Sequence, residues 1–486
     1  MRDCASTTPT ATRWWWRSRT TPTSCARTRN CCGDRTFQKE DNPMKAPGPG
    51  LVETGRMLPK LGKDPLGTVG ALLGGYGDVV RVKAGPMLVY LIADPAMTEY
   101  VLKDNYTNYR KSPIYDEFSI LLGDGQLTTN HLEYWRKQRK LIHPAFSHSH
   151  VKGFADSITD SAAALLNRWD GAAGEFRDIY ADYVELLLAV TGRILFSIDL
   201  STDTTQVTEA MRAAFAFIMK RVNAPLKLPQ SFPTPQARQV ARKVGELDAV
   251  VRHLIDERRQ GGETADVLTA LVRARDEDGN SMREEDLLNE IKTLLVAGHE
   301  SPANALSWAC YLLALHPEIQ ERLAAEVRDV LDTRTPNFAD LGRLDYCRMV
   351  IEETMRLYPP AWIVERTPIA DDVIGGYEVP AGARITLCMY YIHRDKRLWD
   401  DPEAFRPERF ADAEVADRHK FAYFPFSGGP RICLGKDLSM TEMVLVLAMT
   451  VQRFRLELDP AHPVVPLASV NLRPEHGIRI RPVRRD

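Results

Sequence analysis

FSGGPRICLG, residues 426–435, holds a single cysteine, Cys433, in a loop framed by glycines. No second cysteine lies nearby, so the segment has neither the spacing of a zinc-binding pair nor that of a local disulfide. The commonest role of a lone cysteine beside a turn is that of a buried structural residue. The alternative is a metal ligand, because a thiolate held on a tight loop suits axial ligation of haem iron.

The neighbours of Cys433 favour the ligand interpretation. Gly429 and Gly435 allow the backbone to pass close to a macrocycle and to turn its N–H groups toward the sulfur. Residues Leu434 to Phe454 are expected to form a helix whose positive N-terminal end faces the thiolate. Arg431 is placed to meet a haem propionate. The loop therefore predicts a haem-thiolate site.

Composition excludes several other classes of protein. The chain has 486 residues, of which 44% are hydrophobic and 26% charged, with a formal net charge of −2. This balance implies neither nucleic acid nor an anionic membrane as an obligate partner. The eight cysteines show no regular spacing, so a reducing cytoplasm is expected rather than a secreted disulfide framework. No apolar run approaches the ~20 residues of a membrane span, so no transmembrane segment is predicted.

The first 43 residues differ from the rest of the chain. They are rich in Thr, Arg, Cys and Trp and lack helical or strand periodicity. They are interpreted as a disordered, dispensable leader or as a misassigned start, with Met44 as the natural initiator; the sequence does not separate the two. The Pro/Gly stretch 46–50 then marks the beginning of a single domain over residues 44–486.

Secondary-structure signals predict a mainly helical domain with a small β region. A β-hairpin is expected from Asp78–Val82 and Met87–Ile92, with further β-rich stretches at Val373–Thr386 and Val464–Ile480. The longest predicted helix runs from about Glu284 to Leu315. It is apolar on nearly all sides, which indicates a core helix.

The centre of that helix reads AGHESP, residues 297–302. Pro302 has no N–H and cannot bond to the carbonyl of Gly298, so the helix is expected to open into a groove there. Glu300 and Ser301 are the candidate catalytic residues, because a carboxylate and a hydroxyl can deliver protons. The alternative is a structural kink with a paired, buried glutamate.

Both segments resemble those of the cytochrome P-450 monooxygenases. The haem loop of that family has Phe, Gly, Arg, Cys and Gly at the spacings seen here, and its oxygen-activating segment usually reads Ala-Gly-x-(Asp/Glu)-Thr-Thr. Ser301 and Pro302 depart from the second pattern. The resemblance extends from about Met44 to the C-terminus and implies the cytochrome P-450 fold, with haem b bound non-covalently between the long helix and the Cys433 loop. It implies that Cys433 ligates iron and that the haem contacts include Ala297, Phe426, Gly429, Arg431 and Gly435.

Other matches to the family carry less specific signals. Trp135 and Arg139 lie on the predicted helix Glu133–His143 and, with Arg366, resemble residues that reach the haem propionates; an ordinary surface helix is the alternative. The resemblance also implies a buried structural triad of Glu353, Arg356 and Arg409.

The resulting hypothesis is a monooxygenase, expected to be monomeric, that hydroxylates or epoxidises a lipophilic small molecule such as a fatty acid or terpene, using O2. No flavin-binding module follows the loop, so electrons are expected from a ferredoxin with its reductase or from a flavoprotein reductase. A basic face of Arg136, Lys137, Lys140 and Lys436 is one candidate docking surface; a solvated charged face is the alternative. A peroxide-driven peroxygenase and a non-enzymatic haem-binding protein are the alternatives. The candidate substrate contacts are Phe118, Ile120, Leu121 and Leu122 in a loop, Phe215, Phe217 and Met219 on a helix, and Leu294, Ala297, Ala361, Trp362, Ile363 and Val364.

Overall fold

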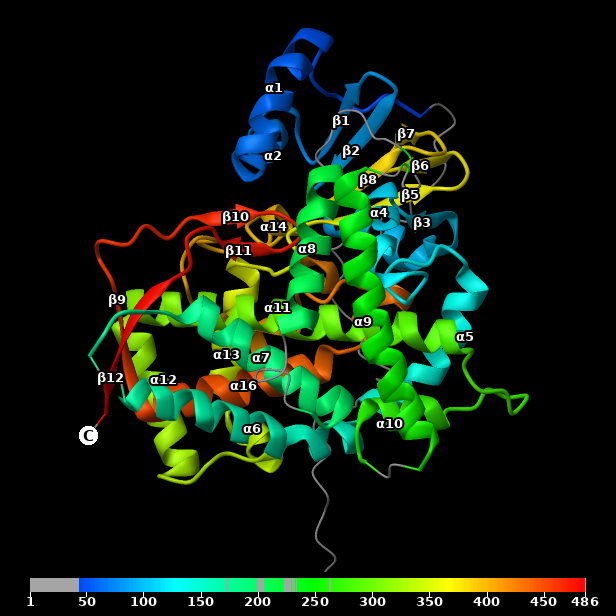
Figure 1. Ribbon diagram of the computed structural model, residues 1–486. Coiled ribbons are helices and arrows are strands. Elements are labelled where there is room, and N and C mark those ends of the chain that lie inside the picture. The colour runs from blue at the N-terminus through cyan, green and yellow to red at the C-terminus, as the bar shows by residue number, and fades with distance from the viewer. Residues whose placement is uncertain are drawn as a thin grey trace, which may run out of the picture.

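The structure, a computed structural model, describes residues 43–171, 174–198, 205–222, 229, 232, 234–261 and 264–485. The predictions for the leader therefore concern residues that, apart from residue 43, lie outside the described part. Met44 pairs with Tyr377 in an isolated β-bridge, where its backbone N–H donates to Gly376 O at 2.9 Å. The described chain is mainly helical with small sheets, as predicted (Figure 1).

The helices are α1 (Leu51–Lys63), α2 (Pro65–Tyr76), α3 (Pro95–Glu99), α4 (Pro113–Leu122), α5 (Leu132–Ile142), α6 (His148–Gly171), α7 (Ile179–Phe196), α8 (Thr205–Val222), α9 (Pro235–Arg259), α10 (Val267–Arg273), α11 (Glu284–Leu315), α12 (Pro317–Leu331), α13 (Asp345–Leu357), α14 (Met389–Ile392), α15 (Asp412–Val415) and α16 (Lys436–Arg453). The strands are β1 (Val79–Ala84), β2 (Met87–Ile92), β3 (Tyr109–Lys111), β4 (Arg177–Asp178), β5 (Val364–Pro368), β6 (Asp372–Ile374), β7 (Tyr377–Val379), β8 (Arg384–Leu387), β9 (Phe454–Leu458), β10 (Pro466–Ala468), β11 (Leu472–Pro474) and β12 (Arg479–Arg484).

Helix α11 has the bounds that the sequence predicted and crosses the middle of the molecule (Figure 1). It contacts α7, α13 and α16, among other elements. Because neighbours cover it on several sides, its apolar residues do not form a single stripe, and most of its side chains are buried. The helix therefore provides a rigid central support for any residue that projects from it.

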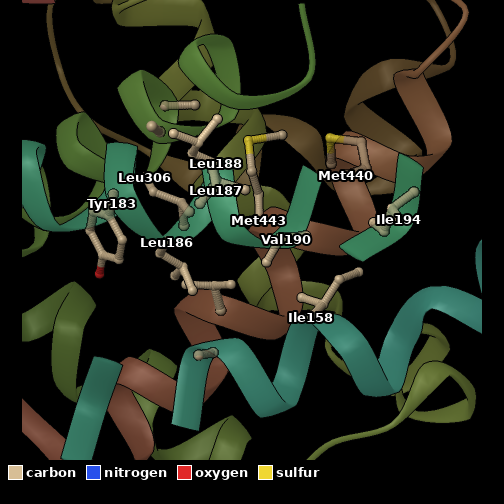
Figure 2. Close-up of a cluster of buried hydrophobic side chains, with 14 of the residues drawn as sticks. Ile158, Tyr183, Leu186, Leu187, Leu188, Val190, Ile194, Leu306, Met440 and Met443 are labelled. Carbon is tan, nitrogen blue, oxygen red and sulfur yellow. The ribbon is translucent and has the colours of Figure 1, made fainter. Parts of the chain in front are cut away.

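The main hydrophobic core fills the space between α6, α7, α11 and α16 (Figure 2). Helix α7 contributes consecutive buried residues from Leu186 to Val190, because it packs against both α6 and α11. Ile158 of α6, Leu306 of α11 and Met443 of α16 belong to the same cluster. This core fixes α11 relative to α16, the helix that follows Cys433.

A second core lies against the five-stranded sheet, whose strand order is β1-β2-β8-β5-β3. Strands β1 and β2 form the predicted hairpin, and β2 pairs with β8 in parallel. Strand β3 pairs with β5 in antiparallel register, with Lys111 opposite Arg366. The sheet thus brings together two cationic residues, Lys111 and Arg366, that are 255 positions apart in the sequence.

Two local predictions were wrong. Residues 118–122 belong to α4 rather than to a loop, since Pro113 begins a helix there. The helix after Cys433 begins at Lys436 and ends at Arg453, because Phe454 starts strand β9. Helix α11, in contrast, continues through Pro302, in agreement with its predicted bounds. Within the part of the chain that the structure describes, no helix is long and apolar enough to span a membrane.

Candidate active site around Cys433 and helix α11

The Cys433 loop is held in a tight turn by its own backbone. The N–H of Cys433 donates to Phe426 O at 2.9 Å, which closes the loop. Ser427 has a φ of 62° and Gly429 a φ of 67°, both in the left-handed region. A side chain at Gly429 would collide with the backbone, because its Cβ would lie 1.9 Å from Leu102 O. Glycine at this position is therefore required by the neighbouring backbone of the protein.

Cys433 differs from the other cysteines that the structure describes. All four are free, but Cys310, Cys347 and Cys388 are buried, whereas water reaches Cys433. Protein atoms still surround it, and this burial raises the pKa of its thiol. A hydrogen bond from the Gly435 N–H and the positive charges of Arg139 and Lys436 lower that pKa. The site thus contains the groups that stabilise a thiolate.

Gly435 caps the N-terminus of α16 with a φ of −86°, which any residue can adopt. No described protein atom lies within 4 Å of the position that a Cβ would take there. Its contribution to the loop is its N–H, which points to the sulfur of Cys433. The first turn of α16 follows directly, so the positive end of the helix lies beside the cysteine.

Ala297, Glu300 and Ser301 share one face of α11, at positions i, i+3 and i+4. Ala297 is exposed and the other two are partly exposed, on a helix whose neighbouring residues are mostly buried. This face is the accessible side of the helix. His299 lies elsewhere, buried, with its Nδ1 3.0 Å from Leu295 O, and burial lowers its pKa.

Gly298, where the helix was predicted to open, lies against α7. A Cβ at Gly298 would lie 3.1 Å from Cγ2 of Thr191, so this side of α11 faces α7. Glycine therefore serves the close approach of two helices. Pro302 still deprives the Gly298 carbonyl of its helical donor. One turn later, Asn304 Nδ2 donates to Glu300 O at 2.9 Å, and Asn304 Oδ1 is buried without a partner.

The carboxyl group of Glu300 has partners outside its own helix. Burial raises its pKa, while the positive charge of Arg473 and a hydrogen bond from the Asn471 side chain lower it. Asn471 precedes β11 and Arg473 belongs to it, so the C-terminal part of the chain supplies both. Sequence reasoning missed these partners, because nothing in the local pattern links residues more than 170 positions apart.

Arg139 and Arg431 lie against the ring of Trp135, and Arg366 lies close enough for its charge to act on Arg431. The guanidinium carbons of Arg431 and Arg139 lie 4.6 Å and 6.0 Å from the centre of the indole ring. Arg431 donates to Thr129 O at 3.3 Å and Arg139 to Ile432 O at 2.9 Å. Burial and the charge of Arg366 lower the pKa of Arg431 to about 10. The fold thus brings together Trp135, Arg139, Arg366 and Arg431, which separate motifs in the sequence indicated as propionate contacts.

Lys111 is a further member of this group, and the sequence analysis did not identify it. It is buried, and its Nζ lies 4.4 Å from the ring centre of Tyr115. Burial lowers its pKa strongly, and the charges of Arg366 and Arg431 add to this effect. We call Lys111, Arg139, Arg366 and Arg431 the cation cluster. Only the pairing of β3 with β5 reveals Lys111, since a lone lysine in a short strand carries no motif.

The cation cluster lacks acidic partners in the described chain. None of its four members forms an ion pair with a carboxylate of the residues that the structure describes. Like charges opposite each other on two strands are destabilising, and each desolvated charge costs several kcal/mol. Such a cluster fits a group with two negative charges. Haem carries two propionates, so the donor set and the thiol of Cys433 both fit a haem.

A model of the cytochrome P450 family matches residues 49–479. The chain belongs to the cytochrome P450 family. It is therefore an oxidoreductase of the monooxygenase class with a haem-iron cofactor, as the Cys433 loop predicted. As a P450 it also needs O2 and a redox partner, and acts on a lipophilic substrate.

Curated relatives of this P450 include enzymes named for terpenes. A cyclooctat-9-en-7-ol 5-monooxygenase of Streptomyces melanosporofaciens is 35% identical over 393 residues, 80% of this chain and 85% of that protein. Cyclooctatin synthase of the same bacterium is 31% identical over 431 residues, 88% and 93% of the two chains. A pentalenene oxygenase of Streptomyces avermitilis is 28% identical over 413 residues, 84% and 91%.

The candidate substrate contacts of this P450 separate into two groups. Water reaches Ile120, Phe215 and Ala297, and the ring of Phe215 packs edge-on against Phe118, 6.3 Å between centres. The partly accessible residues also include Met219, Leu294, Ala361 and Ile363. The buried residues, which belong to the core, are Phe118, Leu121, Leu122, Phe217, Trp362 and Val364.

The basic face of the P450 is largely neutralised. Lys137 pairs with Asp276 at 2.8 Å and Lys140 with Glu277 at 3.0 Å, both from the loop after α10. Arg136 pairs with Glu133 of its own helix. Lys436 instead lines a groove of about 430 Å³ beside the Cys433 loop, together with Glu99, Lys103, Glu352, Lys420, Phe424, Phe426 and Ile432. Phe426 and Ile432, two residues of the cysteine loop, belong to the lining of this groove.

The predicted structural triad of the P450 is confirmed. Arg356 Nε and Nη2 donate to the two carboxylate oxygens of Glu353 at 2.7 Å and 2.8 Å. Arg409 Nε lies 3.3 Å from Glu353 Oε1. All three residues are buried. Helix α13 positions two of them one turn apart, and the segment 407–410 brings the third.

Proposed function

We propose that this P450 hydroxylates or epoxidises a cyclic terpene or a similar lipophilic molecule, with haem b bound by residues 44–486. The observation that supports the site is the convergence of the accessible thiol of Cys433 with a cation cluster that has no acidic partner among the described residues. The terpenes in the names of three relatives support the substrate class. Electrons would come from a separate ferredoxin with its reductase or from a flavoprotein reductase.

The reaction has a simple balance. A substrate C–H bond, O2, two electrons and two protons give an alcohol and water, and the bound haem supplies the activation of O2. Cys433 would ligate the iron, with the Gly435 N–H stabilising its thiolate. The cation cluster and Trp135 would hold the propionates. Gly429 and Phe426 shape the ligand loop, and Ala297 leaves room for the macrocycle beside α11.

Glu300 and Ser301 would carry the protons. They occupy the accessible face of α11 next to Ala297, the face on which a substrate and water would lie. Burial raises the pKa of Glu300, so its carboxyl can exchange protons closer to neutral pH than an exposed glutamate. The Ser301 hydroxyl can accept one hydrogen bond and donate another. This pair orients water and moves protons toward the reacting oxygen.

A turnover experiment tests the proposed function. The holoenzyme is mixed with cyclooctat-9-en-7-ol, pentalenene or a saturated fatty acid, and the spin-state shift of the haem spectrum is recorded. Each compound is then incubated with NADPH, a surrogate ferredoxin and its reductase under ¹⁸O2. One ¹⁸O atom in a terpene product is expected. Product from hydrogen peroxide alone would identify a peroxygenase, and no product with any oxidant would contradict the proposal.

Ser301→Ala should uncouple electron use from product formation. The variant removes a hydroxyl worth about 0.5–1.5 kcal/mol in a hydrogen bond, so product per NADPH should fall roughly 2- to 10-fold. NADPH consumption should change little, and hydrogen peroxide should account for the difference. Both are measured in the same assay.

Ser301→Thr is the matched control, since it keeps the hydroxyl at the same position. It should retain coupling near that of the wild type. If Ser301→Ala is fully coupled and Glu300→Ala equally unaffected, this segment of α11 is only structural.

A further inference from the structure

Residues 125–130 lie between helix α11 and the cation cluster, and we call them the bracing segment. One side of the segment packs directly on α11. A Cβ at Gly125 would lie 2.4 Å from Oγ1 of Thr293, so the backbone passes close to the helix there. The N–H of Gln126 donates to Glu290 Oε2 at 3.1 Å. Helix α11 therefore fixes the start of the bracing segment.

The other side of the bracing segment supports the residues proposed to hold the propionates. Gln126 Nε2 donates to Trp135 O at 3.2 Å, so the segment is tied to α5. The carbonyl of Thr129 accepts the hydrogen bond from Arg431. The side chain of the last residue of the segment accepts the N–H of Lys111 at 2.7 Å. A movement of the bracing segment would thus reach two members of the cation cluster and the indole between the arginines.

The side-chain amide of Gln126 has a fixed orientation. The Trp135 carbonyl can only accept a hydrogen bond, so Nε2 faces it and Oε1 is left for another partner. This Oε1 is buried and has no hydrogen-bond partner among the described residues, and the same is true of Glu290 Oε1. Buried polar atoms nearly always have a partner. A proton on Glu290 Oε1 would serve both atoms, because it would turn one of the two acceptors into a donor.

The surroundings of Glu290 contain no charge that would stabilise a carboxylate. Its side chain is 0% exposed, and none of the ion pairs of the described residues includes it. The cations on this part of α11 pair with other acids, Arg283 with Asp286 at 2.7 Å and Lys292 with Asp248 at 2.8 Å. A buried carboxylate without a cation is strongly disfavoured relative to the neutral acid. Burial and the lack of a cation therefore both favour a protonated Glu290.

The titratable groups that face Glu290 are themselves acids. Asp286 lies one turn before it on α11, Asp124 precedes the bracing segment, and Tyr134 of α5 donates to Asp286 at 3.0 Å. Burial, with a smaller effect of the two aspartates, raises the pKa of Glu290 to about 8, although hydrogen bonds from Gln126 lower it. Because this pKa lies above the ordinary value, a hydrogen bond that the acid donates is complete at low pH and is lost as the pH rises through about 8.

We propose that Glu290 is a positioning residue that acts as a neutral acid: its Oε2 accepts the N–H of Gln126, and its protonated Oε1 donates to Gln126 Oε1. These two hydrogen bonds fasten the bracing segment to α11, and the segment in turn holds Trp135 and Arg431 for the propionates. The proposal rests on the propionate role given above to the cation cluster. When the acid releases its proton to water, the two Oε1 atoms repel each other and the bracing segment is loosened.

Haem transfer to excess apomyoglobin tests this role, because it measures how firmly the propionates are held. The rate of haem loss from the wild type should rise about 2- to 10-fold as the pH passes through about 8, the effect of one hydrogen bond. In Glu290→Gln the amide reproduces both hydrogen bonds of the neutral acid, so haem loss should stay slow and show no such step. In the infrared spectrum, the protonated-carboxyl band that Glu290→Gln lacks should disappear from the wild type over the same pH range.

Two other variants make the result specific. Gln126→Ala removes the partner of Glu290, so haem loss should already be about 2- to 10-fold faster at neutral pH. Adding Glu290→Gln to it should have no further effect, because both substitutions act on one linkage. Glu285→Gln removes an exposed carboxylate of the same helix, which lies 3.5 Å from Arg252, and should keep the wild-type step. The carbon monoxide spectrum of each variant reports whether the thiolate ligand is intact.

Arg431→Gln separates this proposal from the one on which it rests. If this variant retains haem like the wild type, the propionate role of the cation cluster is wrong and the role of Glu290 falls with it. If Arg431→Gln loses haem quickly but Glu290→Gln keeps the wild-type step, only the role of Glu290 is overturned, since another group then titrates. An infrared spectrum with Glu290 ionised at neutral pH would overturn it too. So would loss of the step in Glu285→Gln, because the effect would then be one of net charge.

Discussion

Cys433→Ala should abolish the red-shifted band that a thiolate ligand gives to the reduced, carbon-monoxide-bound haem, and with it all monooxygenase activity. None of the other cysteines that the structure describes can replace Cys433, because Cys310, Cys347 and Cys388 are buried. The loop around Cys433 is closed by its own backbone hydrogen bond to Phe426, so a neighbouring side chain cannot move into its place. The absorption spectrum of the reduced carbon monoxide complex measures the effect directly.

Two further variants keep this test decisive. Cys433→His offers an imidazole in place of the thiolate, so a protein that still binds haem should show the band shifted away from the thiolate position. Cys388→Ser alters a buried thiol of the second core and should leave the band unchanged. A thiolate band in either Cys433 variant would show that Cys433 is not the ligand.

The elements with strong local signals were predictable from the sequence. Helix α11 has a continuous apolar pattern that ends before His316 and Pro317, and its bounds agree with the prediction. The hairpin of β1 and β2 was marked by a turn at Gly85 and Pro86 between two apolar runs. Such features depend on neighbouring residues only. The motifs at residues 426–435 and 297–302, which indicated the family, are local in the same way.

The features that depend on distant pairing were not predictable. Lys111 became visible only through its register with Arg366, and the partners of Glu300 come from the last sixteenth of the chain. The direction of Gly298 toward Thr191 follows from the packing of α7, which no local pattern encodes. The acids that neutralise Lys137 and Lys140 belong to a loop more than 130 residues away. Long-range packing decides each of these.

Arg356→Ala should prevent the accumulation of haem-loaded protein. All five N–H donors of this side chain are used: two on Glu353 and the others on His393 O at 2.8 Å, Pro402 O at 2.7 Å and Ala404 O at 3.1 Å. Removing it leaves the buried carboxylate of Glu353 without its main partner, a loss of about 3–5 kcal/mol. A whole domain is stable by only about 5–15 kcal/mol.

The segment that Arg356 holds explains why the effect should reach the haem. Its carbonyl partners lie in residues 393–404, between the sheet and the Cys433 loop, and His393 Nε2 accepts the N–H of Phe424, two residues before Phe426. Loss of the arginine would therefore destabilise helix α13 and would also remove the segment that supports the cysteine loop. Arg356→Lys should fail too, because an ammonium has three donors and cannot reproduce the planar fork.

Arg242→Ala is the matched control for Arg356→Ala. Arg242 also pairs with a glutamate on its own helix, Glu246, at 2.5 Å, but both side chains are exposed. An exposed pair contributes about 0–1 kcal/mol, so this variant should accumulate and bind haem like the wild type. Soluble yield, haem content per chain and urea unfolding compare the two. A stable, haem-loaded Arg356→Ala protein that merely turned over slowly would contradict the structural role, because the arginine would then act on the reaction and not on the fold.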